Sequence, residues 1–160
     1  KYNGTLLIKP AKSSIAAVKE KAQELFKTGR SLPQEALIGR LNPVIRGWGN
    51  YYRHAVSKDV FSDVDHAIWR MTWNWAKRRH PRKSRQWVKD RYFAYKDGRD
   101  WEFTDGSITL FRMATIPIRR HVKIRGDANP YDPQDASYFA KRHARRGNQP
   151  PATPPPWLPL

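Results

Sequence analysis

Two consecutive helical patterns fill the stretch LNPVIRGWGNYYRHAVSKDVFSDVDHAIWRMTWNWAKRRHP, residues 41–81. Apolar residues return at every third or fourth position in each half, which is the spacing of an α-helix that buries one face. The first stripe begins upstream and comprises Leu37, Leu41, Val44, Ile45, Trp48 and Tyr52. The second comprises Val60, Val64, Ile68, Met71 and Trp75, with Trp69 and Trp73 on an adjacent stripe. The stretch therefore predicts two helices whose stripes form the structural core of a bundle.

Proline and glycine interrupt the first of these helices. Pro43 lacks a backbone donor and crowds the preceding turn, so we expect a kinked helix or two nearly collinear helices, the second capped by Asn42. Gly47 and Gly49 each cost about 1 kcal/mol in a helix interior relative to alanine. Close approach of another backbone would justify that cost.

Upstream, the pattern predicts a further helix. Apolar residues recur at helical spacing over residues 15–26, after Ser13 or Ser14 as an N-cap and before a stop at Gly29. Before it, the run TLLIK at residues 5–9 has the composition of a short strand.

Downstream, Ser84 can cap a fourth helix that carries Trp87, Val88, Tyr92 and Phe93 and stops by Gly98. The period then changes from about 3.6 to 2, which predicts strands at residues 101–103 and 108–111 joined by the Asp105-Gly106 turn.

Two more elements complete the expected order. Residues 118–125 alternate as a strand, and Asp132-Pro133 opens a last short helix with Tyr138 and Phe139 inside it. The fold class is mainly α: a small helical bundle over residues 10–97, an α+β nucleic-acid-binding segment over 98–146, and a disordered, Pro-rich tail over 147–160.

Charge is the strongest global signal. The 160 residues hold 31 Lys and Arg against 14 Asp and Glu, a net charge of +17, and no Cys. Such an excess favours a polyanionic partner, most simply nucleic acid. The lack of Cys excludes disulfides, Cys-zinc sites and a thiol nucleophile in these residues. No apolar run is long enough to span a membrane, and no stretch has the pattern of a signal peptide. Because the chain begins at Lys1 and not at Met, we expect a piece of a longer protein.

The basic stretch from Arg70 to Arg91 is the first candidate binding site. It contains nine cationic residues and a single acid, Asp90. Clustered cations release the counterions condensed on nucleic acid, whereas the dipole of a helix end accounts for only two or three of them. The cations are Arg70, Lys77, Arg78, Arg79, Arg82, Lys83, Arg85, Lys89 and Arg91.

Two further groups are candidates. Arg46, Asn50, Tyr51 and Arg53 lie off the buried stripe of their helix, where they could touch phosphate, a 2′-hydroxyl or an unstacked base. In the predicted strand at 118–125, one face consists of basic residues and is a weaker candidate for DNA or RNA; that face could equally be a solvated strand surface. Its residues are Arg119, His121, Lys123 and Arg125.

Patterns for catalysis are missing from the sequence. Its five His are dispersed, there is no phosphate-binding glycine loop, and no two Asp are adjacent. Asp63 and Asp65 diverge on a helix, so we expect them to be surface charges. We therefore expect no catalytic residue, no metal ligand and no cofactor in this chain.

These residues resemble a known family. The stretch 41–81 is similar to the maturase-specific segment, domain X, of bacterial group II intron-encoded proteins. The sequence LLIKPAKSSI, residues 6–15, resembles the join to that family's reverse transcriptase core, so residues 1–9 would be a remnant strand of the core. Residues 118–142, IRRHVKIRGDANPYDPQDASYFAKR, resemble the segment that often follows domain X.

The resemblance implies a function. Domain X serves as the thumb of the reverse transcriptase and binds intron RNA, whose own chemistry performs splicing; the following segment contributes to binding of target DNA. It implies a maturase module of the bacterial cytoplasm whose partners are intron RNA, target DNA and the missing polymerase core. Mg²⁺ would belong to the RNA or to that core. The residues that carry the implied RNA contacts are Arg46, Asn50, Tyr51, Arg53, Lys77, Arg78 and Arg79, and more weakly Arg119, His121 and Lys123.

Alternatives remain open at the level of sequence. The Tyr-x-Asp-Asp motif of the polymerase and the Cys ligands of the family's endonuclease do not occur in these residues. The chain could thus be the thumb fragment of an active reverse transcriptase that needs a palm in cis or in trans. It could also be a generic basic DNA-binding module or, least favoured, a protein of the membrane surface.

Overall fold

The computed structural model describes residues 7–119 and 124–145. The chain divides into two compact units, residues 1–121 and 122–160. In chain order, the first unit contains the helices α1 (Lys12–Thr28), α2 (Gln34–Tyr52), α3 (Lys58–Arg79) and α4 (Arg85–Tyr92), the strands β1 (Phe93–Lys96) and β2 (Arg99–Phe103), and the 3₁₀ turn η1 (Met113–Thr115). The second contains the 3₁₀ turn η2 (Pro133–Asp135) and α5 (Ala136–Arg145). The mainly α class with a small β component is confirmed.

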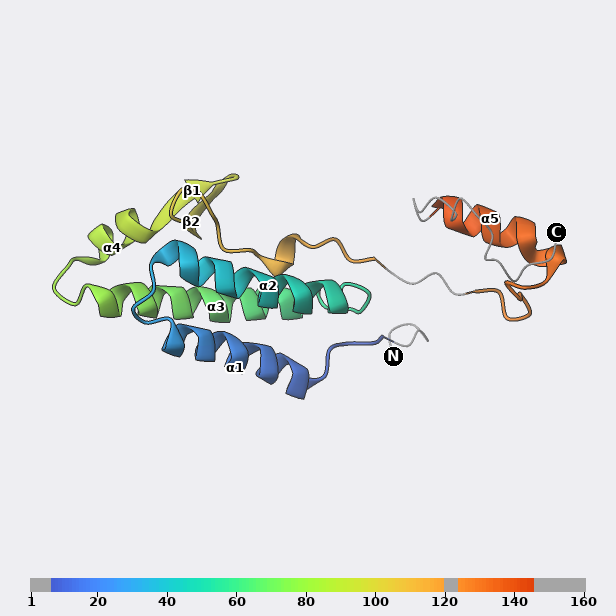
Figure 1. Ribbon diagram of the computed structural model, residues 1–160, viewed down its shortest axis with the longest axis horizontal. Coiled ribbons are helices and arrows are strands. Elements are labelled where there is room, and N and C mark those ends of the chain that lie inside the picture. The colour runs from blue at the N-terminus through green and yellow to red at the C-terminus, as the bar shows by residue number, and fades with distance from the viewer. Residues whose placement is uncertain (1–6, 120–123, 146–160) are drawn as a thin grey trace. The chain divides into compact units, whose positions relative to one another are not determined.

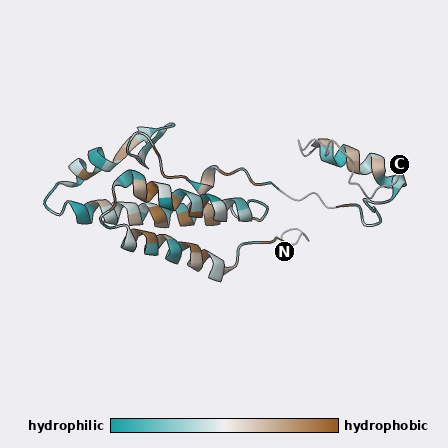
Figure 2. Ribbon diagram, in the orientation of Figure 1, coloured by the Kyte–Doolittle hydropathy of each residue, from teal (hydrophilic) through white to brown (hydrophobic). Residues whose placement is uncertain are grey.

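Helices α1, α2 and α3 lie side by side and form the bundle (Figure 1). Each buries one face in a common core, and hydrophobic residues recur along all three (Figure 2). The fully buried core side chains include Ala22, Leu37, Ile38, Leu41, Ile45, Phe61, Val64 and Ile68. The helical stripes predicted from the sequence are therefore the faces that pack.

The expected serine cap of α1 is not formed. The helix begins after Ala11, which makes no side-chain cap. Ser14 lies inside the helix, where its hydroxyl accepts hydrogen bonds from Trp48 Nε1 at 3.2 Å and from the Tyr52 hydroxyl at 2.8 Å. The serine thus ties α1 to α2 instead of starting α1.

Helix α2 is a single helix that runs through Pro43. The carbonyl four residues before the proline belongs to Gly39, which is exposed, so solvent can satisfy it. Asn42 caps nothing. Its amide donates to the Thr109 carbonyl at 3.0 Å, and its Oδ1 accepts from the Phe111 amide at 2.7 Å. The predicted Asn42 cap is wrong because this side chain has partners almost seventy residues further along the chain.

The small sheet differs from the expected one. Ser84 caps α4 as predicted, by accepting from the Trp87 amide at 3.2 Å. The helix ends at Tyr92, and the antiparallel hairpin β1–β2 follows around Asp97-Gly98, both at positive φ. The predicted strand at 108–111 is wrong: only an isolated bridge, Thr104 to Thr109, forms there.

Residues 110–118, which we call the strap, run back over the bundle. Met113 and Ile116 are buried in the core, and a Cβ at Gly49 would clash with both side chains. The close approach inferred at Gly49 is therefore real, although side chains make it. At Gly47, by contrast, no described residue lies within 4 Å of an added Cβ. The first unit thus extends past residue 97, where the sequence suggested a boundary, because both the hairpin and the strap belong to it.

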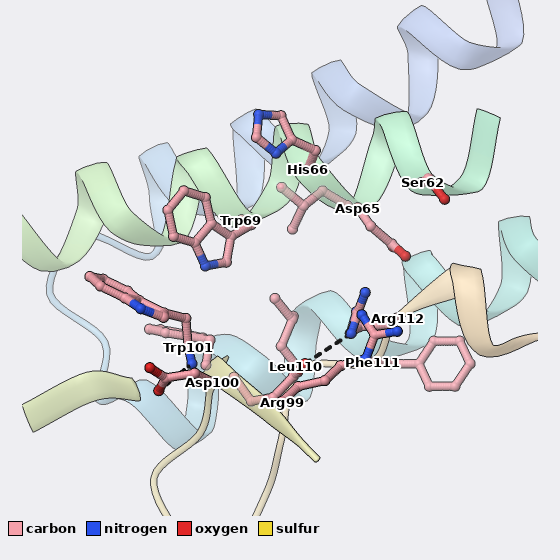
Figure 3. A pocket seen from close by; sticks show the side chains of 13 residues that line it. Ser62, Asp65, His66, Trp69, Arg99, Asp100, Trp101, Leu110, Phe111 and Arg112 are labelled. Carbon is pink, nitrogen blue, oxygen red and sulfur yellow. Dashed lines mark hydrogen bonds and ion pairs between the residues drawn. The ribbon is translucent and has the colours of Figure 1, made fainter. Parts of the chain in front are cut away.

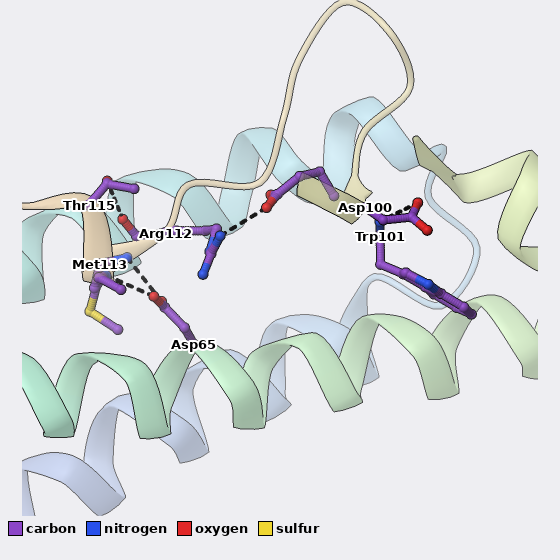
Figure 4. Close-up of polar contacts among 8 residues, drawn as sticks. Asp65, Asp100, Trp101, Arg112, Met113 and Thr115 are labelled. Atoms are coloured by element: carbon purple, nitrogen blue, oxygen red, sulfur yellow. Dashed lines mark hydrogen bonds and ion pairs between the residues drawn. The ribbon is translucent and has the colours of Figure 1, made fainter. Parts of the chain in front are cut away.

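Asp65 holds the strap to α3 and is not a surface charge. Its carboxylate accepts from the Met113 amide at 3.0 Å and from the Ala114 amide at 2.8 Å (Figure 4). Burial raises the pKa of Asp65, and the two backbone donors lower it by less. Asp63 does lie at the surface, paired with Lys19 at 2.6 Å.

In the second unit, Asp132 accepts from the Gln134 amide at 2.9 Å and leads through η2 into α5, as predicted. A strand was predicted at residues 118–125. Residues 118–119 and 124–125 are not in a strand, and residues 120–123 lie outside the described residues. Residues 7–9 of the other predicted strand have no regular structure, and 1–6 lie outside. The expected Pro-rich tail also lies outside the described residues. Among those described, no helix is long and apolar enough to cross a membrane.

Candidate nucleic-acid interface

A groove of about 750 Å³ lies between α1 and α3 and gathers cations from both helices. We call it the α1–α3 groove. Its floor is apolar, and its polar residues are Gln23, Lys27, Arg30, Asn74, Arg78 and Arg79. Lys27 and Arg30 stand next to buried Phe26 and Gly29 at the end of α1, while Arg78 and Arg79 stand beyond buried Trp75 and Ala76 near the end of α3. Packing of the two helix faces therefore brings the four cations to one groove.

Arg79 joins the groove to the bundle. One of its guanidinium nitrogens, Nη1, donates to the carbonyls of Arg30 at 3.3 Å and Leu32 at 2.5 Å. The guanidinium also lies 4.6 Å from the centre of the Trp75 ring, whose Nε1 donates to the Gly29 carbonyl at 3.1 Å. Arg79 thus fixes the α1–α2 connection as well as contributing charge.

Arg78 is differently placed. It is exposed, and among the described residues none of the five ion pairs uses it or any other cation of the groove. An unpaired cation is available to a phosphate without first breaking an internal contact. Arg78 and Lys27 are therefore the clearest probes of what the groove binds.

Four further basic residues lie in the last turn of α3 and in the segment that follows it. Lys77, Arg82, Lys83 and Arg85 are all exposed. Lys83 Nζ lies 5.3 Å from the centre of the Trp87 ring. A 2.7 Å hydrogen bond between His80 Nε2 and the Tyr92 hydroxyl ties the start of the α3–α4 loop to the end of α4. Of the predicted cluster at 77–85, Arg78 and Arg79 line the groove together with Lys27 and Arg30, whereas Lys77, Arg82, Lys83 and Arg85 do not line it.

The second predicted group lies at the other end of the bundle, where α2 ends and α3 begins. Asn50 and Tyr51 are exposed, and the guanidinium of Arg46 stacks 4.7 Å from the centre of the Phe111 ring. Arg53 is half-buried, and its Nε has no hydrogen-bond partner among the residues that the structure describes. Because the 22 residues of α3 separate the two groups, roughly 30 Å of helix lies between them.

The third predicted group is divided. Arg119 is exposed, and its backbone joins the second group: its amide donates to the Arg53 carbonyl at 2.9 Å, and its carbonyl lies 2.7 Å from His54 Nδ1. His121 and Lys123 lie outside the described residues. Arg125 belongs to the second unit, where it pairs with Asp135 and lies 5.2 Å from the centre of the Tyr138 ring.

Residues expected to hold the bundle lie in or against the core. Leu41, Ile45, Ile68 and Trp75 are buried, while Trp48, Tyr52, Trp69 and Met71 are half-buried and packed on that core. Lys27 and Arg30 are groove residues that sequence reasoning missed. Lys27 lies one helical turn after Gln23 on α1, and Arg30 follows just after the end of that helix, but nothing local shows that this surface meets α3. In the described part of the chain, no three His, Cys, Asp or Glu gather as metal ligands.

These features define a class of protein: a small basic helical bundle with an appended hairpin and a cation-lined groove. Residues 15–93, from α1 to the start of β1, match the family described as group II intron, maturase-specific domain. This part of the chain belongs to that family, and the chain therefore carries a maturase-specific domain. No curated protein matches the chain in a sequence search.

The match covers the stretch 41–81 on which the resemblance rested, so that resemblance is confirmed. It also includes the groove cations and the group at the end of α2. The similarities noted for residues 6–14 and 118–142 lie outside the matched residues and stay predictions.

Proposed function

We propose that this chain binds structured group II intron RNA through the α1–α3 groove and promotes its splicing. The observation that carries the proposal is the gathering of Lys27, Arg30, Arg78 and Arg79 around one groove inside the maturase-specific domain. In this proposal the RNA performs the chemistry, with its own Mg²⁺, and the protein stabilises the active RNA shape. The chain itself then needs no catalytic residue and no cofactor.

Charge and geometry support this proposal together. The four cations lie at the ends of two packed helices and line the same groove, so their backbone positions are set before RNA binds, which lowers the entropic cost of ordering them. Gln23 and Asn74 add amide donors and acceptors that can reach sugar and phosphate oxygens. A rigid, two-sided set of this kind suits the phosphates of a folded RNA.

A second candidate function is that of a reverse transcriptase thumb. The observation that favours it is an exposed apolar corner before α1: Ile8 is 69% exposed, and its carbonyl accepts from the amide of Val56, which is also exposed. Apolar residues at such a place favour a protein neighbour. We propose that this neighbour is a polymerase core supplied in cis or in trans, and that target DNA is a further ligand.

The test is competitive binding of the whole chain to a folded group II intron RNA from its own locus. The competitors are equal masses of an unrelated structured RNA and of duplex DNA, each at low and at physiological salt. We expect the intron RNA to be preferred at both salt concentrations, and splicing at limiting Mg²⁺ to become faster when the chain is added.

A charge-matched comparison makes the test specific to the groove. Arg78→Ala should weaken binding of the intron RNA, whereas Arg40→Ala, which removes an exposed cation of α2 outside the groove, should not. Equal binding of all three nucleic acids that collapses with salt would contradict the proposal. Such a result would mean that only the net charge acts.

A further inference from the structure

A second cavity, of about 700 Å³, lies between α3 and the segments that follow the hairpin turn. Its walls are Trp69 and His66 of α3, Trp101 of β2, and Leu110 and Arg112 of the strap (Figure 3). It contains none of the residues that line the α1–α3 groove. We call it the Trp101 pocket.

Trp101 adopts a backbone conformation that a bulky residue rarely takes. Its φ is +64°, a left-handed value that costs a non-glycine residue of order 1–3 kcal/mol. The strand pairing is irregular at the same place, since Ala94 pairs with Glu102 but Lys96 pairs with Arg99. An irregularity of this kind re-aims a side chain, and here it turns the indole towards α3.

Neighbouring residues hold Trp101 in this position. Its ring centre lies 6.0 Å from that of Trp69 and 5.4 Å from that of Trp73, both edge to face. Its amide donates to Asp100 at 2.9 Å, and Lys89 both pairs with Asp100 at 2.8 Å and lies 4.9 Å from the Trp101 ring. The indole is half-buried, so part of its surface remains open to the pocket.

Arg112 and Asp65 stand at the opposite end of the pocket from Trp69 and Trp101 (Figure 3). Arg112 Nη1 donates to Glu102 at 3.0 Å, and Asp65 lies beside them with both oxygens already bonded to the strap (Figure 3). At the rim, Arg99 is exposed and forms no ion pair among the described residues. The pocket thus offers aromatic surface, a donor–acceptor pair and a nearby free cation.

We infer that the Trp101 pocket takes an unstacked nucleobase of the bound RNA. Single-stranded bases stack on aromatic side chains. The Arg112–Glu102 pair can exchange hydrogen bonds with the donor and acceptor edge of a base, and Arg99 can meet the phosphate that follows. The inference rests on the proposed function, because it deepens RNA binding by adding a base contact to the phosphate contacts of the groove.

The strain at Trp101 supplies a clean variant. Trp101→Gly removes the ring and relieves the positive φ, so the backbone should keep its course. Tyr95→Ala is the matched control, since Tyr95 is an exposed aromatic residue of the same hairpin that does not line the pocket. Thermal unfolding of both variants checks that they remain folded.

The experiment measures affinity of the full chain for single-stranded oligoribonucleotides of eight A, C or U residues, and in parallel for the folded intron RNA. Trp101→Gly should weaken oligonucleotide binding by about 5- to 100-fold, as expected for one lost stacking contact. The slope against salt should stay unchanged because no phosphate contact is lost. Tyr95→Ala should bind as the unaltered chain does, and Trp101→Phe should recover part of the affinity.

The outcomes separate the two proposals. If the intron RNA is preferred but Trp101→Gly binds oligonucleotides as tightly as the unaltered chain, the base pocket is wrong and the proposed function stands. If oligonucleotide binding depends on Trp101 without any preference for intron RNA, the pocket stands and the maturase proposal fails. Absence of any oligonucleotide binding by the unaltered chain would overturn the pocket outright.

Discussion

Gly47 and Gly49 lie in one turn of α2, but the packing requires a glycine at only one of the two positions. A Cβ at residue 49 would clash with Met113 and Ile116 of the strap, whereas a Cβ at residue 47 would meet no atom of the described part of the chain within 4 Å. Only Gly49 is therefore required by the packing. The absence of a side chain at residue 49 leaves room for strap residues that lie more than sixty positions later in the sequence.

Alanine substitutions at these two positions should have opposite effects. Gly49→Ala should destabilise the fold by about 1–3 kcal/mol because it overpacks the core. Gly47→Ala should stabilise it by about 0.5–1 kcal/mol through helix propensity alone. Urea unfolding of both variants measures the difference, and equal effects would contradict the described packing of the strap.

The raised pKa of Asp65 makes the stability of the fold depend on pH. Burial raises its pKa from 3.8 and is the largest effect. The Ala114 and Met113 amides and the charge of Arg112 lower the pKa by less, and the charge of Glu102 raises it slightly. Because the folded pKa exceeds the unfolded one, its contribution to stability is fully present below the unfolded pKa. That contribution is lost as pH rises through the raised value.

Asp65→Asn isolates this effect because it removes one titrating group. The free energy of unfolding of the unaltered chain, minus that of the variant, should fall as pH rises from about 3 to 7. Circular dichroism during urea titration at several pH values measures it. A difference that instead grows with pH would show that the amide donors outweigh burial.

At the scale of elements, local patterns were enough to locate the helices, although not all of their ends. The apolar stripes of α1, α2 and α3 are visible at their spacing, and Ser84 caps α4 from a position beside its own helix. Other assignments failed where a side chain bonds to a distant segment. Asn42, Ser14 and Asp65 each satisfy a partner that the local sequence does not reveal.

The hairpin shows a related limit. Two Asp-Gly pairs, at 97–98 and 105–106, signal turns of similar strength. The first makes the β1–β2 turn, whereas Asp105 accepts hydrogen bonds from the amides of Ser107 and Ile108 and stabilises a tight local turn without a second strand. In the hairpin that does form, β1–β2, Phe93 and Phe103 pack on the tryptophans of α3.

Asp65→Ala tests the element that the sequence could not predict, the strap. It leaves two amides without their acceptor, so we expect a loss of about 1–3 kcal/mol of stability. Hydrogen exchange should accelerate at Met113 and Ala114 more than at α1. If these two amides exchange at the original rate, the described link between α3 and the strap is wrong. Asp63→Ala is the matched control because Asp63 is exposed and its carboxylate pairs with a side chain, Lys19, and not with the strap.

At the scale of the whole molecule, the candidate RNA-binding residues form separate surfaces. The groove and the loop after α3 occupy one end of the bundle, and Arg46, Asn50, Tyr51 and Arg53 occupy the other. The sequence indicated the cluster after Arg70 from its charge, yet it could not supply Lys27 and Arg30, because the register between α1 and α3 is a tertiary property. An RNA that contacts both surfaces would have to extend along the length of the bundle.

The measurement that tests the central claim most directly is the salt dependence of intron RNA binding by a double variant, Lys27→Ala with Arg78→Ala. If both cations contact phosphate, the slope of log affinity against log salt should flatten by about 0.7 to 0.9 for each. The control, Lys12→Ala with Arg40→Ala, removes the same charge outside the groove and should leave the slope unchanged. Identical slopes for the two double variants would contradict the claim that the α1–α3 groove holds the RNA.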